Sequence, residues 1–111
     1  AAARGVQGYQ YSWGDVWRNR YCNSRGVLGS TSVVGTFPQA TSPCGAVDMT
    51  GNVWDWTSSL YESGKSGRVL CGGSWVIVSD GCSAWCRSYD APGYRDGSIG
   101  FRLARTLRPG P

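Results

Sequence analysis

Five cysteines are the side chains of this sequence with the widest chemistry, because a thiolate can act as a nucleophile or as a metal ligand. They stand at Cys22, Cys44, Cys71, Cys82 and Cys86. Since their number is odd, at least one stays free even in an oxidising compartment, and the redox compartment is left open. No two of them form a CxxC pair, and the spacing of Cys82 and Cys86 suits two buried small apolar side chains equally well. We therefore do not expect these thiols to hold a metal ion.

Histidine is absent from the sequence, which narrows the chemistry further. Without an imidazole there is no Ser-His-Asp or Cys-His nucleophile, no histidine-bound zinc, and no iron site of two histidines and a carboxylate. The net charge is +4, from 11 basic and 7 acidic residues, but the basic residues are scattered. A nucleic-acid surface would cluster them, so we expect no nucleic-acid partner. The chain has no run of about 20 apolar residues, so we expect no membrane insertion.

The elements that position these side chains are expected to be short. The chain has 111 residues, at most one domain, and its 17 glycines favour turns over long helices. Five short strands, few helical stretches and long glycine-rich loops indicate an α+β fold. The residue pattern predicts the end of a helix at 1–5, an aromatic strand at 9–13, a loop over 18–43 with at most one short extended piece, and a turn entering a strand at 48–56. It further predicts a buried strand at 68–75, a segment without periodicity at 76–98 and a closing strand at 99–103.

Large aromatic side chains are expected to form the core of this small fold, because they bury the most apolar surface per residue. Three of them, Trp54, Trp56 and Trp75, stand in or directly after the two predicted central strands, and Phe101 stands in the closing strand. Trp85 lies within the segment 76–98, and we expect it to pack underneath that segment.

Five sequence motifs occur in the order and approximate spacing of one known domain. They are ARG near the start, YSWGD, DMTGNVWDWTS, RVLCGGSW and GFRLAR. In these motifs the chain resembles the formylglycine-generating-enzyme domain, whose fold is C-type-lectin-like, with short strands and long irregular loops. The resemblance extends over residues 1–111 but only over the C-terminal part of that domain. It therefore implies that the N-terminal half lies on a missing segment or on another chain.

The catalytic members of that family carry two cysteines at the second and seventh positions after the GGS-aromatic motif, where they bind copper and activate oxygen. Counted from Trp75, these positions hold Ile77 and Cys82. A single thiolate cannot make the two-coordinate site that Cu(I) needs, so we expect no copper and no enzyme activity. The family's sulfoxide synthases use iron held by histidines, which this chain lacks. A copper oxidase acting on cysteine through an unusual pair, Cys82 with Cys86, remains an alternative.

The segment from GGSW to GFRL is most similar to the variable proteins of diversity-generating retroelements, in which it is rewritten at template adenines. Arg87, Pro92 and Arg95 stand where those proteins keep R, P and R. This resemblance implies a non-catalytic protein that presents a diversified surface to a protein or cell-surface ligand, and it is compatible with display on a cell or virion. A lectin-like module of fixed specificity is a further alternative. The positions expected to be rewritten are Val76, Ile77, Val78, Asp80, Gly81, Cys86, Ser88, Tyr89, Asp90, Ala91, Tyr94, Asp96, Gly97 and Ser98.

The DMTGNVWDW turn resembles the metal loop of the same family, which implies a structural Ca2+ site. The ligands implied are the side chain of Asp48, the backbone carbonyls of Gly51 and Val53, and the carboxylate of Asp55. Hard oxygen ligands suit calcium. Independently, two carboxylates within one tight turn repel each other unless a cation or a donor lies between them. The alternative is that Asp48 is a turn residue and Asp55 pairs with an arginine.

Overall fold

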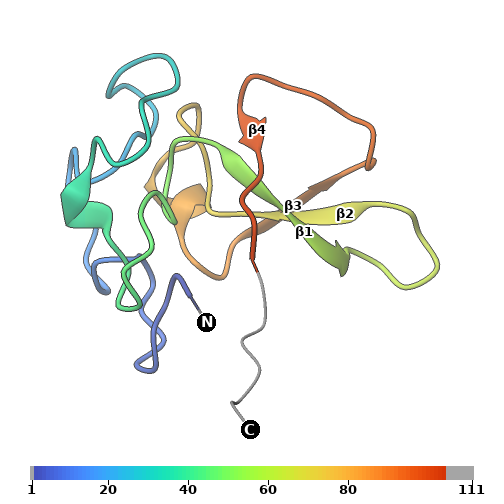
Figure 1. Cartoon of the computed structure of the whole chain (residues 1–111), viewed down its shortest axis with the longest axis horizontal. Helices are drawn as coiled ribbons and strands as arrows, with labels where there is room; N and C mark the ends of the chain where they lie inside the picture. Colours follow the sequence, from blue (N-terminus) through green and yellow to red (C-terminus); the bar gives the residue numbers. More distant parts are fainter. Residues whose placement is uncertain (1, 105–111) are drawn as a thin grey trace, which may run out of the picture.

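A computed structural model of the chain describes residues 2–104, and Figure 1 shows how they are arranged. The regular elements are the 3-10 helix η1 (Pro38–Ala40), the strands β1 (Trp54–Leu60) and β2 (Arg68–Cys71), the 3-10 helix η2 (Ser79–Cys82), and the strands β3 (Arg87–Asp90) and β4 (Ile99–Gly100). The segments between them are turns and irregular loops, which the glycine content favours. None of the helices in the described part of the chain has the length or the apolar character needed to cross a bilayer.

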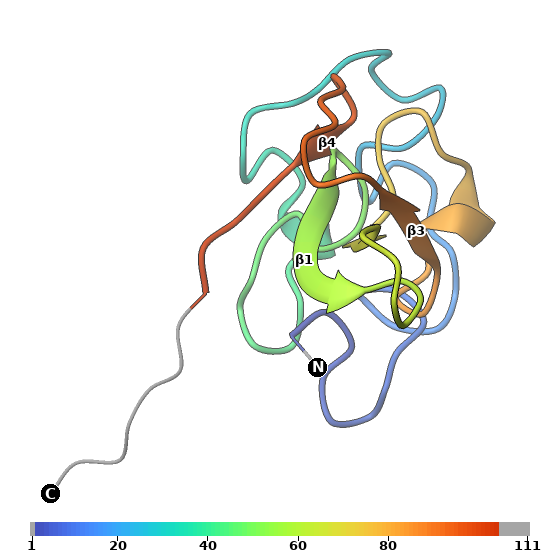
Figure 2. The same cartoon turned by 90° about the vertical axis from the view of Figure 1, so that its right-hand side faces the viewer.

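The four strands form one small sheet in the order β3-β2-β1-β4. β1 and β2 make an antiparallel hairpin in which Asp55 lies opposite Cys71 and Trp56 opposite Leu70. β3 adds antiparallel to β2, and β4 runs parallel to β1. The register shifts within β1 after Trp56, and Figure 2 shows this strand strongly bent. The long loops of the first half of the chain lie to one side of the sheet, at the left of Figure 1.

A turn at Gly51 and Asn52 sets the start of β1. Both residues have positive φ, 79° and 68°, and a Cβ atom at Gly51 would lie 2.6 Å from the carbonyl oxygen of Asn23. Only glycine leaves that room. The N–H of Asn52 donates to the carbonyl of Asn23, and the N–H of Trp75 donates to the carbonyl of Asn52, each at 2.8 Å. This turn therefore ties the long N-terminal loop both to β1 and to the end of the GGSW motif.

The interior of the described part is small and as much polar as apolar. Its polar groups are paired across the loops: Ser12 Oγ donates to the carbonyl of Ala40 at 2.7 Å, and the N–H of Ser12 donates to Thr50 Oγ1 at 3.2 Å. Such pairs offset the cost of burying polar groups. The buried apolar residues are Tyr11, Cys22, Phe37, Ala40, Trp54, Val69, Leu70 and Cys82, and the buried polar residues are Ser12, Asn23, Ser24, Ser42, Asp48, Thr50, Asn52, Ser74 and Ser83.

Several predicted elements are confirmed. The turn at 48–51 leads into β1, the segment 68–75 contains β2, and the loop over 18–43 has η1 as its regular piece. Trp54 is 8% exposed and belongs to the core, as predicted. Trp56 and Trp75 are half-buried.

Other predicted elements are wrong. Residues 2–8 form turns and no helix, while Ala1 lies outside the described residues. The predicted strand at 9–13 is a single bridge between Tyr11 and Gly14. Its aromatic side chains pack on one another instead, with the rings of Tyr11 and Trp13 stacked at 5.3 Å. Residues 2–104 therefore contain four strands where five were predicted for the chain. One of the four, β3, lies inside the segment 76–98, which was expected to lack periodicity.

The predicted places of Phe101 and Trp85 are also wrong. β4 ends at Gly100, so Phe101 leaves the sheet and is 75% exposed. Trp85 does not pack under the segment 76–98 but is 54% exposed, and the guanidinium of Arg4 lies 5.4 Å from the centre of its ring. In this range an exposed guanidinium–aromatic contact contributes only weakly to stability.

Candidate functional site

None of the fourteen positions expected to be rewritten is buried. Eight of them are exposed and six are partly exposed. Two residues between them, Cys82 and Ser83, are 1% exposed and were not among the expected positions. All fourteen expected positions thus reach the surface, as do seven of the nine other residues of the segment 76–98.

The structure places thirteen of these positions in three regions, and the fourteenth, Cys86, directly precedes β3. Residues 76–81 lie beside the long N-terminal loop, where the N–H of Arg25 donates to the carbonyl of Ile77 at 3.0 Å. Residues 88–90 belong to β3, an edge strand of the sheet, and residues 91–98 form the loop from β3 to β4. The indole N–H of Trp75 donates to the carbonyl of Gly97 at 3.1 Å. The two ends of the segment 76–98 are thereby brought together.

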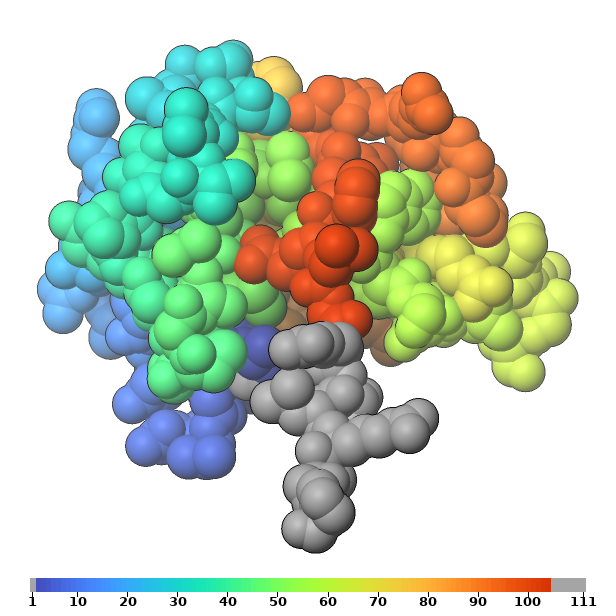
Figure 3. Space-filling view, viewed as in Figure 1, coloured from blue at the N-terminus to red at the C-terminus, as the bar shows by residue number. Residues whose placement is uncertain are grey.

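The loop 91–98 forms one wall of an open groove of about 560 Å3. The groove combines three aromatic side chains, Trp56, Tyr94 and Phe101, with the charged Arg95 and Asp96. Figure 3 shows the loop, in orange, and residues 101–104, in red, on the outer surface of the molecule. Aromatic side chains next to a few polar groups are the usual composition of a binding surface.

A second cleft, of about 360 Å3, lies where residues 76–81 meet the N-terminal loop. Val78 and Ser79 line it together with Trp17, Arg20 and Arg25. The two arginines bring positive charge to this part of the surface, and a guanidinium is suited to carboxylate or phosphate groups.

The sequence interpretation missed two of these lining residues, Trp56 and Phe101, because it placed both in the core. The available signal was the glycine after Ile99, which shortens β4 and leaves Phe101 beyond the sheet.

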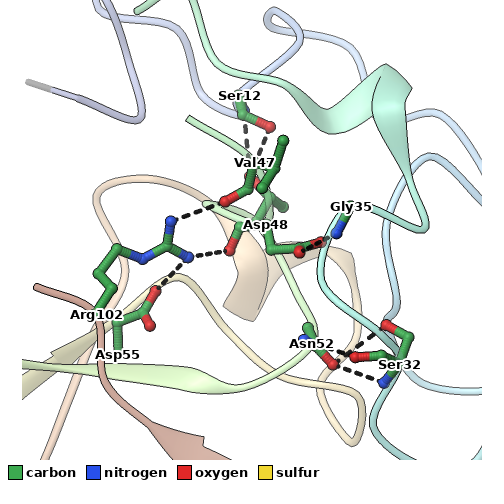
Figure 4. A network of polar contacts seen from close by, with 9 residues as sticks. Ser12, Ser32, Gly35, Val47, Asp48, Asn52, Asp55 and Arg102 are labelled. Carbon is green, nitrogen blue, oxygen red and sulfur yellow. Dashed lines mark hydrogen bonds and ion pairs between the residues drawn. The ribbon is translucent and has the colours of Figure 1, made fainter. Parts of the chain in front are cut away.

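The predicted calcium ligands Asp48 and Asp55 each contact protein donors, as Figure 4 shows. Asp48 Oδ2 accepts a hydrogen bond from the N–H of Gly35 at 2.9 Å. Asp55 Oδ2 pairs with Arg102 Nη2 at 3.1 Å, and the same nitrogen donates to the carbonyl of Asp48 at 2.7 Å. Burial raises the pKa of Asp55, and the guanidinium of Arg102 opposes that shift. The arginine pair of the alternative interpretation is therefore present, and calcium binding itself stays a prediction.

An oxygen-rich neighbourhood lies on the other side of the same turn. Asn52 Oδ1 accepts hydrogen bonds from Ser32 N–H at 3.0 Å and from Ser32 Oγ at 3.3 Å. Asn23 is 1% exposed, and its Oδ1 has no hydrogen-bond partner among residues 2–104. A buried carbonyl oxygen without a donor is the kind of group that a hard cation satisfies. The described residues contain no cluster of three or more acidic, cysteine or histidine side chains that would hold a metal ion by themselves.

Cys82 is buried, and it lies next to a second buried thiol, that of Cys22 from the N-terminal loop. The interaction between the two thiols raises the pKa of Cys22 and lowers the pKa of Cys82. Cys86 instead lies near Cys71, whose pKa is raised mainly by burial. Cys44 is exposed, and its hydrogen bond with Ser42 lowers the pKa of the thiol. All five cysteines are unpaired in the structure.

The sequence matches the sulfatase-modifying factor enzyme 1-like domain over residues 1–107. It is 35% identical over 129 residues to hercynine oxygenase of Mycolicibacterium thermoresistibile, covering 92% of this chain and 29% of that protein. It is 31% identical over 121 residues to the inactive C-alpha-formylglycine-generating enzyme 2 of Mus musculus, covering 94% of this chain and 39% of that protein. The chain thus spans less than half the length of either relative.

Solved structures with the same fold include Treponema denticola variable protein 1, with a TM-score of 0.76 and 26% identity over 90% of this chain and 42% of that one. The structure of CarF has a TM-score of 0.75 and 28% identity over 96% of this chain and 43% of that one. PvdO from Pseudomonas aeruginosa has the same TM-score at 22% identity, over 90% of this chain and 46% of that one. These likenesses confirm the expected C-type-lectin-like fold of the formylglycine-generating-enzyme type.

Proposed function

Because the chain belongs to the sulfatase-modifying factor enzyme 1-like family, we propose that it is a non-catalytic member whose segment 76–98 presents a diversified ligand-binding surface. The observation that carries this proposal is the burial pattern: all fourteen expected positions reach the surface, whereas Cys82 and Ser83 between them are buried. Surface side chains can be exchanged at little cost in stability, but core side chains cannot. The likeness in fold to Treponema denticola variable protein 1 supports the same assignment.

The groove beside the loop 91–98 is where we place the centre of ligand binding. Trp56 and Phe101 belong to the fixed framework, while Tyr94 and Asp96 are among the exchangeable positions. An aromatic framework supplies contact area for different ligands, and the exchangeable side chains supply selectivity, as in antibody loops. We propose that the ligand is a protein or another cell-surface molecule. We propose that this protein itself is displayed on a cell or virion.

The diversified surface is tested by the DNA beside the gene. We expect a near-copy of the stretch that encodes residues 76–98, with asparagine codons AAC or AAT at the fourteen positions, together with a gene for a reverse transcriptase. Sibling copies of the protein should then differ at those positions and agree elsewhere. If the neighbouring DNA holds neither element, the module of fixed specificity is the better description.

The absence of enzyme activity rests on two features of the site. Ile77 occupies one of the two cysteine positions of the catalytic members, and the remaining Cys82 is 1% exposed beside the equally buried Cys22. A metal-centred oxidation needs an open coordination position that substrate and oxygen can reach. The similarity to hercynine oxygenase, an enzyme, supports the alternative that this chain is also catalytic. Copper-dependent oxygen consumption with a cysteine-containing peptide, lost in Cys82→Ser, would establish that alternative.

We also propose that Ca2+ binds at the turn that precedes β1, with Asp48, Gly51, Val53 and Asp55 as the expected ligands. Added Ca2+ should raise the melting temperature of the protein, and Asp55→Asn should abolish that increase, because calcium needs the carboxylate oxygen. Arg102→Gln is the matched control: it removes the competing guanidinium from Asp55 Oδ2 but leaves every calcium ligand in place. If the melting temperature of neither the wild type nor Arg102→Gln responds to Ca2+, the turn binds no calcium, and Asp55 pairs only with the guanidinium of Arg102.

The N-terminal half of the domain is proposed to come from another segment or chain and to cover part of the exposed apolar surface. Val33 and Val34 are 81% and 72% exposed, and Val34 lines one shallow pocket with Val47 and Val53. Exposed apolar patches of this kind are typical of surfaces that pack against a partner.

A further inference from the structure

Cys22 and Cys82 lie far apart in the sequence but meet in the interior of the fold. Each of them is 1% exposed. The backbone around them fixes this arrangement, because Arg25 N–H donates to the carbonyl of Ile77 at 3.0 Å and Asn52 N–H donates to the carbonyl of Asn23 at 2.8 Å. The residues that follow Cys22 are thus hydrogen-bonded to the turn before β1 and to the segment that leads into η2, which ends at Cys82.

Two glycines enclose the sulfur atoms of this thiol pair, Cys22 and Cys82. A Cβ atom at Gly51 would lie 3.0 Å from Cys22 Sγ, and a Cβ atom at Gly73 would lie 2.6 Å from Cys82 Sγ. The two glycine turns are joined by the hydrogen bond from Gly51 N–H to the carbonyl of Gly72, at 2.7 Å. The two sulfur atoms therefore rest over two connected glycine turns in the interior of the fold, where the two thiols interact with each other.

We propose that Cys22 and Cys82 form a disulfide bond when a small peroxide is available as the oxidant. The thiolate of Cys82 attacks one oxygen of hydrogen peroxide, which gives a sulfenic acid and hydroxide. The sulfur of Cys22 then attacks the sulfenic sulfur, the S–O bond breaks, and the S–S bond forms. The thiol proton of Cys22 leaves with the displaced hydroxide as water. In total, two thiols and one peroxide give one disulfide and two water molecules.

This bond would tie the N-terminal loop to the beginning of the segment 76–98. It closes a loop of about 60 residues, and a disulfide across a loop of that length restricts the unfolded chain strongly. The oxidised protein should therefore melt on the order of 10 °C higher than the reduced protein. The bond leaves the exposed positions of the segment 76–98 free, because Cys82 is buried between them.

Peptide mapping of the oxidised wild-type protein tests the proposal directly. The chain is treated with hydrogen peroxide, its remaining thiols are alkylated, and it is digested without reduction. Trypsin cleaves after Arg20 and Arg25, and chymotrypsin then cleaves after Tyr21, so Cys22 is isolated on residues 22–25. Chymotrypsin also cleaves after Trp75 and Trp85, which isolates Cys82 on residues 76–85. We expect these two peptides to be joined, at a mass two hydrogens below their sum, and to separate on reduction.

Single variants identify the thiols responsible for the thermal effect. Cys22→Ser and Cys82→Ser should each lose the rise in melting temperature on oxidation, whereas Cys44→Ser, Cys71→Ser and Cys86→Ser should keep it. The proposal is overturned if oxidised wild-type protein gives Cys22 and Cys82 as alkylated or over-oxidised thiols, or joined to other cysteines such as Cys71 with Cys86. The wild-type map decides this even if a serine variant does not fold.

Discussion

Trp54→Ala is expected to lower the free energy of unfolding by about 3–5 kcal/mol, the cost typical of truncating a buried tryptophan. Trp54 begins β1, lies opposite Ile99 of β4 and is 8% exposed, so its removal leaves a cavity at the start of β1. Neighbouring backbone cannot collapse easily into that space, because Trp54 N–H is fixed to the carbonyl of Ser98 at 2.7 Å. Denaturant unfolding followed by tryptophan fluorescence measures the change.

Trp85→Ala is the matched control, since it makes the same substitution at a tryptophan that is 54% exposed. It should cost less than about 1 kcal/mol, because only a surface contact with Arg4 is lost. Replacing Val76, Val78 and Tyr94 together by serine should likewise stay within about 1 kcal/mol, since all three are exposed. If this triple variant unfolds as readily as Trp54→Ala, the segment 76–98 is core and cannot be a freely diversified surface.

Gly51→Ala is expected to cost about 3 kcal/mol or to prevent folding. Its φ of 79° is unfavourable for alanine by about 1–2 kcal/mol. The new methyl group would also lie 2.6 Å from the carbonyl oxygen of Asn23 and 3.0 Å from Cys22 Sγ, so the loop around them must move. That movement breaks the hydrogen bond from Asn52 N–H to Asn23 and disturbs the thiol pair.

Alanine variants at two other glycines distinguish the cost of backbone strain from the cost of steric conflict in Gly51→Ala. Gly64 has nearly the same φ, 78°, but a Cβ atom there meets no neighbour within 4 Å. Gly64→Ala should therefore cost only about 1–2 kcal/mol. Gly97→Ala, in open space and outside the positive-φ region, should stay within about 0.5 kcal/mol. Equal melting temperatures for the Gly51 and Gly64 variants would contradict the close approach at Gly51.

The central hairpin was predictable from the sequence because its residues carry a local signal. β1 and β2 follow from the apolar and aromatic runs around Trp54 and Val69, which are typical of half-buried strands. β3 was missed because its sequence, RSYD, is polar and lies at the edge of the sheet, where pairing does not need an apolar face. The aromatic run at 9–13 led to the opposite error: it predicted a strand that is absent, because its rings pack on each other around a turn.

Long-range contacts explain what the sequence could not predict in the candidate site. The contact of Arg102 with Asp55 and the meeting of Cys22 with Cys82 join residues from distant parts of the chain. No spacing along the sequence encodes such pairs, because they depend on how irregular loops cross. The exposed positions of the segment 76–98 were easier to predict, since loss of periodicity is itself a signal of a surface segment.

The polar interior has a consequence for how the fold responds to temperature. Among the buried residues of the described part, nine are polar and eight apolar. Exposing apolar surface to water raises the heat capacity, and exposing polar surface lowers it. Unfolding should therefore raise the heat capacity by less than the usual value of roughly 12–15 cal/mol/K per residue. A smaller heat-capacity change flattens the curve of unfolding free energy against temperature. The stability of a scaffold held by hydrogen-bonded loops should therefore vary less with temperature than that of a domain of the same length with an apolar core.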